Sequence, residues 1–219
     1  MARQLTFDLP ARTALGREDF FVSEANARAV AQLDAWQTWP LGKLALVGPQ
    51  GSGKTHLAHV WAEDTGGRVV DADALESLDI PSIETAVAID RADALDKDGE
   101  TALFHLHNHM AGLRLPLLLI GQTEPVRWDI VLPDLKSRVL AADVARIEAP
   151  DDALLAAVLV KLFSDRQILV APRVIDWLLP RIERSFSVAQ HLVEALDREA
   201  LAEGRAVTQP VAARVLSRI

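Results

Sequence analysis

The segment GPQGSGKT, residues 48–55, matches the pattern G-x-x-x-x-G-K-[ST] at every fixed position. It follows the apolar run KLALVG (43–48), which is typical of a buried strand, and precedes HLAHVWAE (56–63), which favours helix. This strand, loop and helix order is the context in which the pattern marks a phosphate-binding loop. The stretch therefore predicts a phosphate-binding loop at the end of a strand.

Each fixed residue of the loop has a role in holding phosphate. The glycines, Gly48, Gly51 and Gly53, allow a tight turn that points backbone N–H groups inward at phosphate oxygens. Lys54 supplies a positive charge for the terminal phosphates, and the hydroxyl of Thr55 can ligate magnesium. The helix that begins near Lys54 adds its positive end to the same site.

The rest of the N-terminal two thirds alternates between strand and helix patterns. Apolar runs at RVVDAD (68–73), AVAID (86–90) and LPLLLIG (115–121) favour three more strands. The segments 24–38 and 101–113 favour helix. Strands that are continuous apolar runs, separated by helices, indicate an α/β fold: a P-loop domain whose parallel sheet is flanked by helices.

After about residue 148 the sequence favours helix throughout. Pro150, Asp151 and Asp152 form a good helix start, and four helical segments follow. We therefore expect a short flexible tail at 1–12, an α/β domain at 13–149 and a small all-helical domain at 150–219.

The composition limits the class of protein. The chain of 219 residues is half hydrophobic, carries a net charge of −8 and contains no cysteine. Disulfides and thiolate metal sites are excluded, and the charge does not favour a surface devoted to DNA phosphates. No run reaches the roughly 20 apolar residues of a membrane span. We expect a cytoplasmic protein that does not enter a membrane.

The strand at 86–90 ends in Asp90, which is the expected second magnesium ligand beside Thr55. The next position, where many nucleotide hydrolases carry an acid that activates water, is Arg91. A guanidinium remains protonated at neutral pH and cannot accept that proton. Asp93, two positions further on, could replace the acid only if the chain turns favourably. An alternative is that Arg91 points away and forms a surface salt bridge. The sequence therefore predicts nucleotide binding with slow hydrolysis.

The whole chain resembles the DnaA-related AAA+ proteins, and in particular the Hda/HdaA group, the regulatory inactivators of DnaA. The resemblance rests on DFFVSEAN (19–26), GPQGSGKTHLA (48–58), VAIDRAD (87–93) and LKSR (135–138). It implies an AAA+ domain followed by a helical lid, and ADP or ATP with Mg²⁺ as cofactors. The acid after Asp90 is missing in this chain, a difference that Hda-like members tolerate.

The resemblance also implies a set of nucleotide-binding positions. These residues are Phe21, Val22, Gly48, Pro49, Gly51, Ser52, Gly53, Lys54, Thr55, His56, Asp90, Gln122 and Gln190. Gln122, or its neighbour Thr123, takes the place of the polar sensor after the fourth strand. Gln190 takes the place of the family's lid arginine and brings no charge. Arg184, six residues earlier, is a candidate replacement for that charge.

By the same resemblance, Arg138 is an arginine finger that acts in trans on ATP bound to DnaA. Such a finger neutralises charge that develops on the transferred phosphoryl group. The residue pattern alone leaves a structural arginine, paired with Asp134 or Glu148, as the alternative. The implied function is negative regulation of replication initiation, with DnaA as partner and a homo-oligomer as a further possibility.

The tail contains QLTFDL (4–9), which is similar to peptides that bind the sliding clamp, the β subunit of DNA polymerase III. In such a peptide, Leu5, Phe7 and Leu9 enter an apolar pocket and the amide of Gln4 is hydrogen-bonded. The resemblance thus implies contact with DNA through the clamp. An alternating apolar segment of this length also suits a strand on the protein's own sheet.

Three other functions remain open at this stage. A self-sufficient AAA+ ATPase, such as a helicase loader related to DnaC, would use the same loop and turn over ATP by itself. A P-loop kinase would need an acceptor pocket in place of the helical C-terminal domain. A DNA-binding module is disfavoured by the negative charge.

Overall fold

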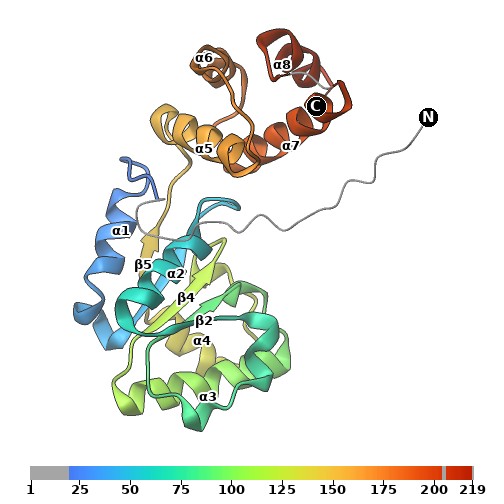
Figure 1. Cartoon of the computed structure of the whole chain (residues 1–219). Helices are drawn as coiled ribbons and strands as arrows, with labels where there is room; N and C mark the ends of the chain where they lie inside the picture. Colours follow the sequence, from blue (N-terminus) through green and yellow to red (C-terminus); the bar gives the residue numbers. More distant parts are fainter. Residues whose placement is uncertain (1–19, 204–205, 219) are drawn as a thin grey trace.

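The computed structural model describes residues 20–203 and 206–218 (Figure 1). The predicted clamp-binding residues 4–9, and with them the whole predicted tail, lie outside the described residues. Within the described part of the chain, no helix combines the length and the apolar content needed to cross a membrane.

Five parallel strands form one sheet in the order β2-β3-β4-β1-β5 (Figure 1). Their bounds are β1 Lys43–Val47, β2 Arg68–Asp71, β3 Val87–Asp90, β4 Leu117–Gly121 and β5 Asp143–Arg146. The four runs that the sequence analysis identified as strands are β1 to β4. It missed β5, which has only four residues, lies at the edge of the sheet and buries only Ala145.

Two pairs of helices cover the two faces of this sheet, and short 3-10 helices connect the elements. The α-helices of this domain are α1 Ala27–Asp34, α2 Lys54–Thr65, α3 Lys97–Leu113 and α4 Pro133–Leu140. The 3-10 helices among the described residues are η2 Trp36–Thr38, η3 Pro40–Gly42, η4 Ala72–Ser77, η5 Ile80–Ser82, η6 Ala92–Ala94, η7 Pro125–Arg127 and η8 Leu179–Arg181. The helix predicted at 24–38 is therefore shorter, and its last turn is η2.

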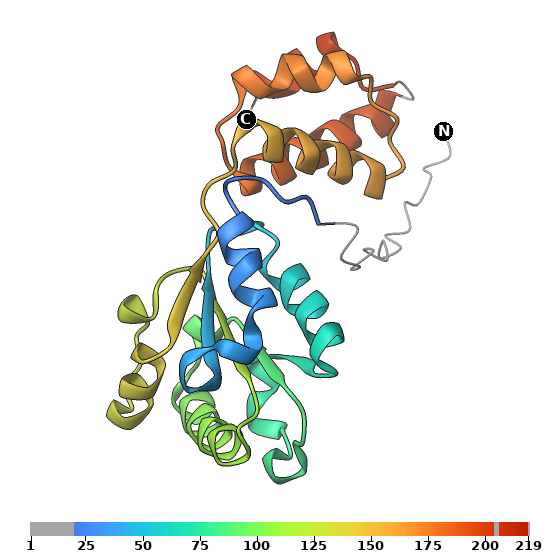
Figure 2. The same ribbon diagram turned by 90° about the vertical axis from the view of Figure 1, so that its left-hand side faces the viewer.

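Alternation along each strand assigns its side chains to the two faces. In β4, Leu118 and Ile120 pack with α1 and α2, whereas Leu117 and Leu119 pack with α3 and α4. Because the three central strands, β1, β3 and β4, are covered on both faces, they are buried almost throughout and appear in the sequence as nearly continuous apolar runs. Figure 2 shows the resulting layers, with the sheet between the helix pairs.

The C-terminal part of the chain folds around its own core of helices. Its elements are α5 Asp152–Asp165, α6 Pro172–Leu178, α7 Phe186–Glu203 and α8 Gln209–Leu216. The carboxylate of Asp151 accepts a hydrogen bond of 2.7 Å from the N–H of Leu154 and so caps α5. Phe163 and Leu192 are fully buried in a cluster that contains no residue of the sheet domain. We call this unit the lid.

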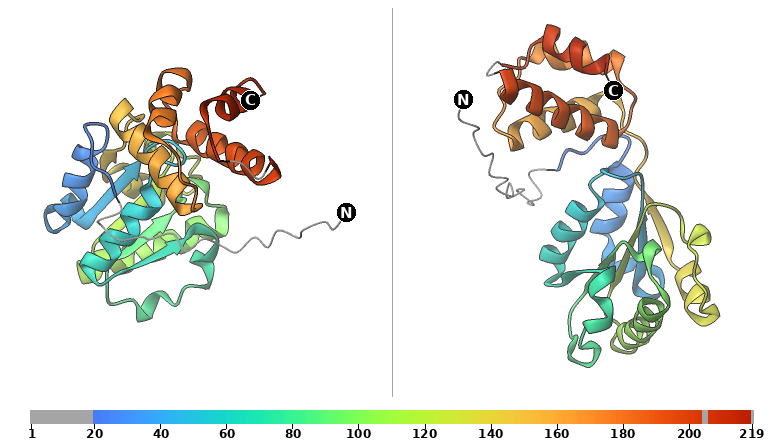
Figure 3. Two further views of the ribbon diagram at one scale, coloured as in Figure 1. Left: turned by 45° about the horizontal axis from the view of Figure 1, so that its top comes forward. Right: turned by 90° about the vertical axis from the view of Figure 1, so that its right-hand side faces the viewer.

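The lid stands over the edge of the sheet at which the strands end (Figures 2 and 3). The predicted division between 149 and 150 falls in the segment that joins β5 to α5. The phosphate-loop motif leads from β1 into α2 at that same edge, so it lies beneath the lid.

Candidate functional site: the phosphate loop beneath the lid

The loop between β1 and α2 has the tight turn that its glycines predict. Gly51 and Gly53 both have left-handed backbone conformations, with φ of +77° and +86°. A side chain is strained in this region of the backbone map, which glycine occupies freely. Gly53 is also the N-cap residue of α2, so the turn delivers the chain directly into the helix whose positive end faces the loop.

Lys54 folds over the loop and holds its charge there. Its Nζ donates hydrogen bonds of 2.8 Å to the carbonyl oxygens of Gly48 and Pro49. Burial lowers the pKa of Lys54, and the nearby carboxylates of Asp90 and Asp93 oppose that shift. The two carbonyl oxygens are uncharged acceptors. Charged phosphate oxygens would form stronger hydrogen bonds with the ammonium group and could replace them.

Thr55 and Asp90 are in direct contact. The Thr55 hydroxyl donates a 2.7 Å hydrogen bond to Oδ2 of Asp90, which joins the start of α2 to the end of β3. A hydroxyl and a carboxylate next to a phosphate loop are the oxygen ligands that Mg²⁺ takes, with water and phosphate completing its octahedron. The arrangement fits the predicted magnesium position.

Arg91 points away from the phosphate loop. Its Nε donates a 3.0 Å hydrogen bond to Oδ2 of Asp71 at the end of β2, and its guanidinium also forms ion pairs with Asp71 and Asp73. These bonds raise the pKa of Arg91 and lower that of Asp71. The alternative in which Arg91 points away and forms a surface ion pair is therefore the one seen in the structure.

The turn at Arg91 returns Asp93 to the sheet edge. Arg91 has φ of +58°, an unusual left-handed conformation for a residue other than glycine, and the chain then enters η6. Oδ2 of Asp93 accepts a 2.6 Å hydrogen bond from the N–H of Gln122, directly after β4. Asp93 is therefore held near Lys54, the outcome that the sequence could not decide. Gln122 is exposed at this edge.

A pocket of about 260 Å³ lies between the loop and the lid. The sheet domain contributes Phe20, Phe21, Asn26, Gly51, Ser52, Gly53 and His56, and the lid contributes Leu154, Ala157, Val158, Lys161, Leu162, Asp165, Phe186 and Gln190. Most of these lining residues are apolar, and the phosphate loop lies at one end, so the pocket suits a flat base joined to phosphates. Pro49 lines a different hollow, on the other side of the loop.

Phe20 belongs to this pocket, although the sequence analysis assigned the pair Phe21 and Val22. The Phe20 ring lies 5.7 Å from the His56 ring, and its edge is 2.9 Å from where a Cβ of Gly53 would be. Phe21 does line the pocket, whereas Val22 lines a separate apolar pocket between α1 and α2. The sequence pair Phe20 and Phe21 was the only pattern that could have indicated Phe20 as a pocket residue.

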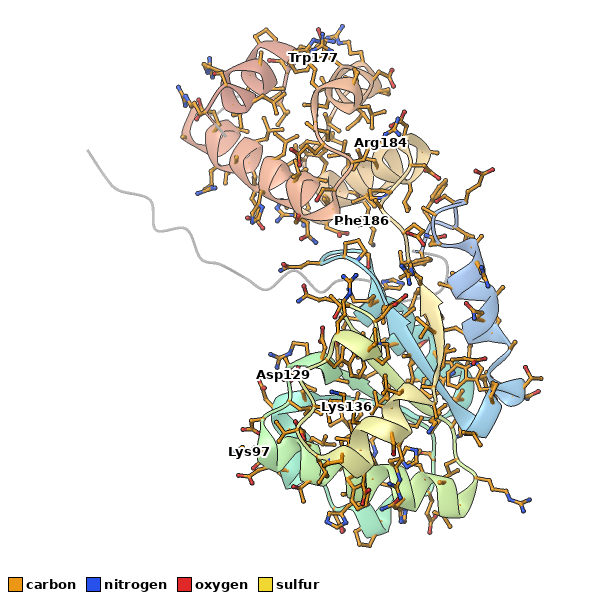
Figure 4. All side chains as sticks on the ribbon, turned by 180° about the vertical axis from the view of Figure 1, so that it is seen from behind. Lys97, Asp129, Lys136, Trp177, Arg184 and Phe186 are labelled. Atoms are coloured by element: carbon orange, nitrogen blue, oxygen red, sulfur yellow. The ribbon has the colours of Figure 1, made fainter. Side chains whose placement is uncertain are left out.

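The lid contributes Gln190 to the phosphate loop, and Arg184 does not reach it. Oε1 of Gln190 lies 3.1 Å from where a Cβ of Gly51 would be, and Phe186 lies equally close. Figure 4 shows Phe186 on the side of the lid that faces the sheet domain. Arg184 instead donates two hydrogen bonds, of 2.8 and 3.0 Å, to the carboxylate of Asp152. The lid thus places the uncharged amide of Gln190, and not the guanidinium of Arg184, beside the phosphate loop.

Arg138 lies near the end of α4, far from this pocket. Its guanidinium carbon is 4.6 Å from the centre of the Phe104 ring, and its Nη1 donates a 3.0 Å hydrogen bond to the carbonyl of Asp134. Neither carboxylate of the alternative assignment holds it, since Asp134 acts through its backbone and Glu148 contacts Arg146. Arg138 is partly exposed, so it is not enclosed within its own domain.

A five-stranded parallel sheet of this order, a phosphate loop after β1, an aspartate at the end of β3 and a helical lid define the AAA+ P-loop fold. Solved structures show the same architecture. Domain III of the replication initiation protein DnaA from Thermotoga maritima superposes with a TM-score of 0.75, at 19% identity, over 96% of this chain and 98% of that domain.

Two further structures are similar at lower coverage. DnaA from Aquifex aeolicus, solved with AMPPCP, has a TM-score of 0.64 and 20% identity, over 85% of this chain and 65% of that one. The Holliday junction branch migration motor RuvB of Thermotoga maritima has a TM-score of 0.66 and 17% identity, over 93% and 72%. At these identities the likeness establishes the DnaA-like AAA+ fold.

Sequence comparison adds little. No protein-family model matches the chain. A Haemophilus influenzae protein described as uncharacterized is 23% identical over an alignment of 186 residues, which covers 78% of this chain and 79% of that protein.

Proposed function

We propose that this chain is a negative regulator of replication initiation that binds an adenine nucleotide and stimulates hydrolysis of the ATP held by DnaA. In this proposal Arg138 is the arginine finger, and residues 4–9 hold the protein on the sliding clamp. The chain's own nucleotide, with ADP as the resting form, acts as a structural ligand that stabilises the folded protein by mass action.

The position of α4 is the observation that carries the proposal. The carbonyl of Arg138 accepts a 2.6 Å hydrogen bond from Lys43, the first residue of β1, whereas the phosphate loop follows Val47, the last residue of that strand. At about 3.3 Å per residue, the two sites lie at opposite edges of the sheet. A finger at this position cannot serve its own nucleotide, so a phosphate that it contacts must belong to another molecule.

The arrangement around Asp90 supports a pocket that binds better than it hydrolyses. Thr55 and Asp90 can hold Mg²⁺, but the following residue, Arg91, is engaged with Asp71 and Asp73 and has no proton-accepting form at neutral pH. The Aquifex aeolicus DnaA of the same fold is bound to AMPPCP, an analogue of ATP. Together these points favour an adenine nucleotide held as a lasting ligand.

The test is phosphate release from ATP-loaded DnaA in the presence of clamp on DNA. The wild-type protein is expected to accelerate release, and Arg138→Ala is expected to lose the acceleration, since fingers of this kind contribute on the order of 10³–10⁵ in rate. Lys136→Ala, which removes another exposed cation from α4, is the matched control and should stay active. Equal activity of the two variants would refute the finger.

The clamp assignment has its own experiment. Deletion of residues 1–10 should abolish binding to the clamp while leaving ADP binding unchanged, because the phosphate loop and its pocket lie in the described part of the chain. Clamp binding that persists after the deletion would show that another surface makes the contact.

Asp93 favours one alternative, a self-sufficient ATPase of the DnaC-like helicase-loader type. Its carboxylate lies at the sheet edge, bonded to the N–H of Gln122 and near Lys54, where it could activate water. Rapid ATP turnover by the isolated protein that is lost in Asp93→Asn would support this alternative. Slow turnover that is the same in wild type and Asp93→Asn would support the regulator.

A further inference from the structure

The helix that carries Arg138 is held at both ends by buried charges. At its start, the Glu100 carboxylate accepts hydrogen bonds of 2.9 Å from the N–H of Val131 and 2.7 Å from that of Leu132. At its end, Nζ of Lys43 donates to the Arg138 carbonyl. Glu100 and Lys43 are each only 4% exposed. An anion at the start and a cation at the end both match the dipole of α4.

One face of α3 supplies the rest of this arrangement. Glu100, Phe104 and His107 are spaced four and three residues apart, so they line the same side of the helix. The Phe104 ring lies against the guanidinium of Arg138, and Nε2 of His107 lies 3.1 Å from Nζ of Lys43. Burial and the neighbouring cations lower the pKa of His107 to about 4, so at pH 7 its neutral ring accepts that hydrogen bond.

A helix can be packed against a sheet without any of these polar groups. The apolar contacts of α4 come from Leu135 and Val139, which are fully buried. Burying a carboxylate and an ammonium that do not pair with each other costs free energy, and apolar replacements are often as stable. The polar groups instead fix where α4 begins, where it ends and where the guanidinium of its last turn lies.

We propose that Lys43, Glu100, Phe104 and His107 are positioning residues that fix the direction of Arg138 for a phosphate on a neighbouring molecule. We call these four residues the α4 cradle. This inference rests on the proposed function of Arg138. A free arginine side chain has many rotamers, and a misplacement of about 1 Å can cost on the order of 10²-fold in rate. The α4 cradle limits the rotamers of the Arg138 side chain before a neighbouring molecule binds.

Phe104 gives the sharpest test, because one pair of variants separates the ring from the volume. Phe104→Leu keeps an apolar side chain but removes the ring face, and Phe104→Tyr keeps the ring. In the DnaA assay, Phe104→Leu should lower the maximal stimulated rate about 2- to 5-fold, as expected for loss of a cation–π contact. The concentration for half-maximal stimulation should not change. Phe104→Tyr should retain the wild-type maximum. Equal maxima for Phe104→Leu and wild type would overturn the role of the ring.

Hydrogen exchange tests the cradle without DnaA. In Lys43→Met, the amides of the last turn of α4 should exchange at least 10-fold faster than in wild type. In Glu100→Gln, the amides of Val131 and Leu132, directly before α4, should exchange faster by the same factor. The β4 amides should stay at the wild-type rate in both variants. Lys43→Arg, which keeps the charge, should keep the last turn slow. If wild type fails to stimulate DnaA, the proposed function fails, but exchange still decides whether α4 is held. Unchanged exchange in both Lys43→Met and Glu100→Gln would overturn the cradle.

Discussion

Arg91 follows Asp90 in sequence, but the two side chains take part in separate interactions. Asp90 receives the Thr55 hydroxyl, whereas the guanidinium of Arg91 lies between Asp71 and Asp73 beyond the end of β2. The left-handed backbone at Arg91 makes this separation possible and brings Asp93 to the phosphate-loop edge. Arg91 thus occupies the position where an acid is usual, and the turn at Arg91 places a different acid, Asp93, near the phosphate loop.

The first prediction concerns this ion pair. Arg91→Ala should raise the pKa of Asp71 toward its ordinary value, because the hydrogen bond from Arg91 is the main cause of the lowered value. A carboxylate whose pKa is lowered by folding stabilises the folded protein at any pH above its pKa in the unfolded chain. This stabilisation is lost as the pH falls toward the lowered pKa. The variant should therefore show a shallower loss of stability in acid. NMR titration of the Asp71 carboxyl measures the shift, with Arg68→Ala as the control, and an unchanged titration would contradict it.

Gly51 provides a second prediction at this scale. Gly51→Ala should lower the free energy of unfolding by about 1–2 kcal/mol, because its φ of +77° strains any side chain. It should also weaken ADP binding, since the new methyl group would press on Gln190 and Phe186 of the lid. Calorimetric titration with ADP measures the binding.

Gly66→Ala is the matched control for this change. Gly66 has φ of +63° and no atom within 4 Å of an added Cβ, so it tests the strain without the lid contact. We expect a similar loss of stability and unchanged ADP binding. If Gly51→Ala also binds ADP normally, the lid does not press on the loop in the bound state.

At the scale of elements, the sequence predicted the strands and helices whose buried residues form a clear apolar pattern. The three central strands are apolar runs, and α5 begins at Asp152, within the predicted helix start. β5 left a weaker pattern than the other edge strand, β2, because it has one β-branched residue, Val144, where β2 has two, Val69 and Val70. Lys54, Thr55 and Asp90 lie together at one edge of the sheet, and their role in binding a nucleotide stays a prediction. The sequence could not reveal contacts that depend on how distant elements pack, such as Arg91 with Asp71.

The contact between α3 and β1 yields a pH prediction. His107 has its pKa lowered to about 4 by burial and by Lys43 and Arg138, whereas an unfolded histidine titrates near 6.5. Between those values the unfolded chain binds more protons, so His107 makes the fold less stable as the pH falls from 6.5 toward 4. His107→Gln should reduce the loss of stability between pH 6.5 and 5, above the range of most carboxyl groups.

Urea unfolding at pH 6.5 and pH 5 measures this difference. His105→Gln, the same change on the exposed side of α3, is the control. An equal loss of stability in wild type and His107→Gln would show that the His107 ring can gain a proton without cost, for example by turning away from Lys43.

At the scale of the whole molecule, the candidate nucleotide pocket lies between two bodies with separate cores. The sheet domain and the lid share the wall of one pocket, which contains residues from the loop and from α5 and α7. A ligand that fills this pocket joins the two bodies, so its binding free energy adds to the stability of their arrangement. Arg138 belongs to the other edge of the sheet, near the first residue of β1, so the lid does not cover it.

The last prediction concerns the charge that the lid lacks. Gln190 lies against the phosphate loop at Gly51, so Gln190→Arg should place a guanidinium where the terminal phosphates of a nucleotide would be. Because ATP has one more phosphate than ADP, we expect the affinity for a non-hydrolysable ATP analogue to rise relative to ADP, on the order of 10-fold or about 1.4 kcal/mol. Calorimetric titration in Mg²⁺ measures both affinities. Gln190→Met, which has a similar length and no charge, is the control, and equal nucleotide preference in the two variants would mean that the side chain at 190 does not reach the phosphates.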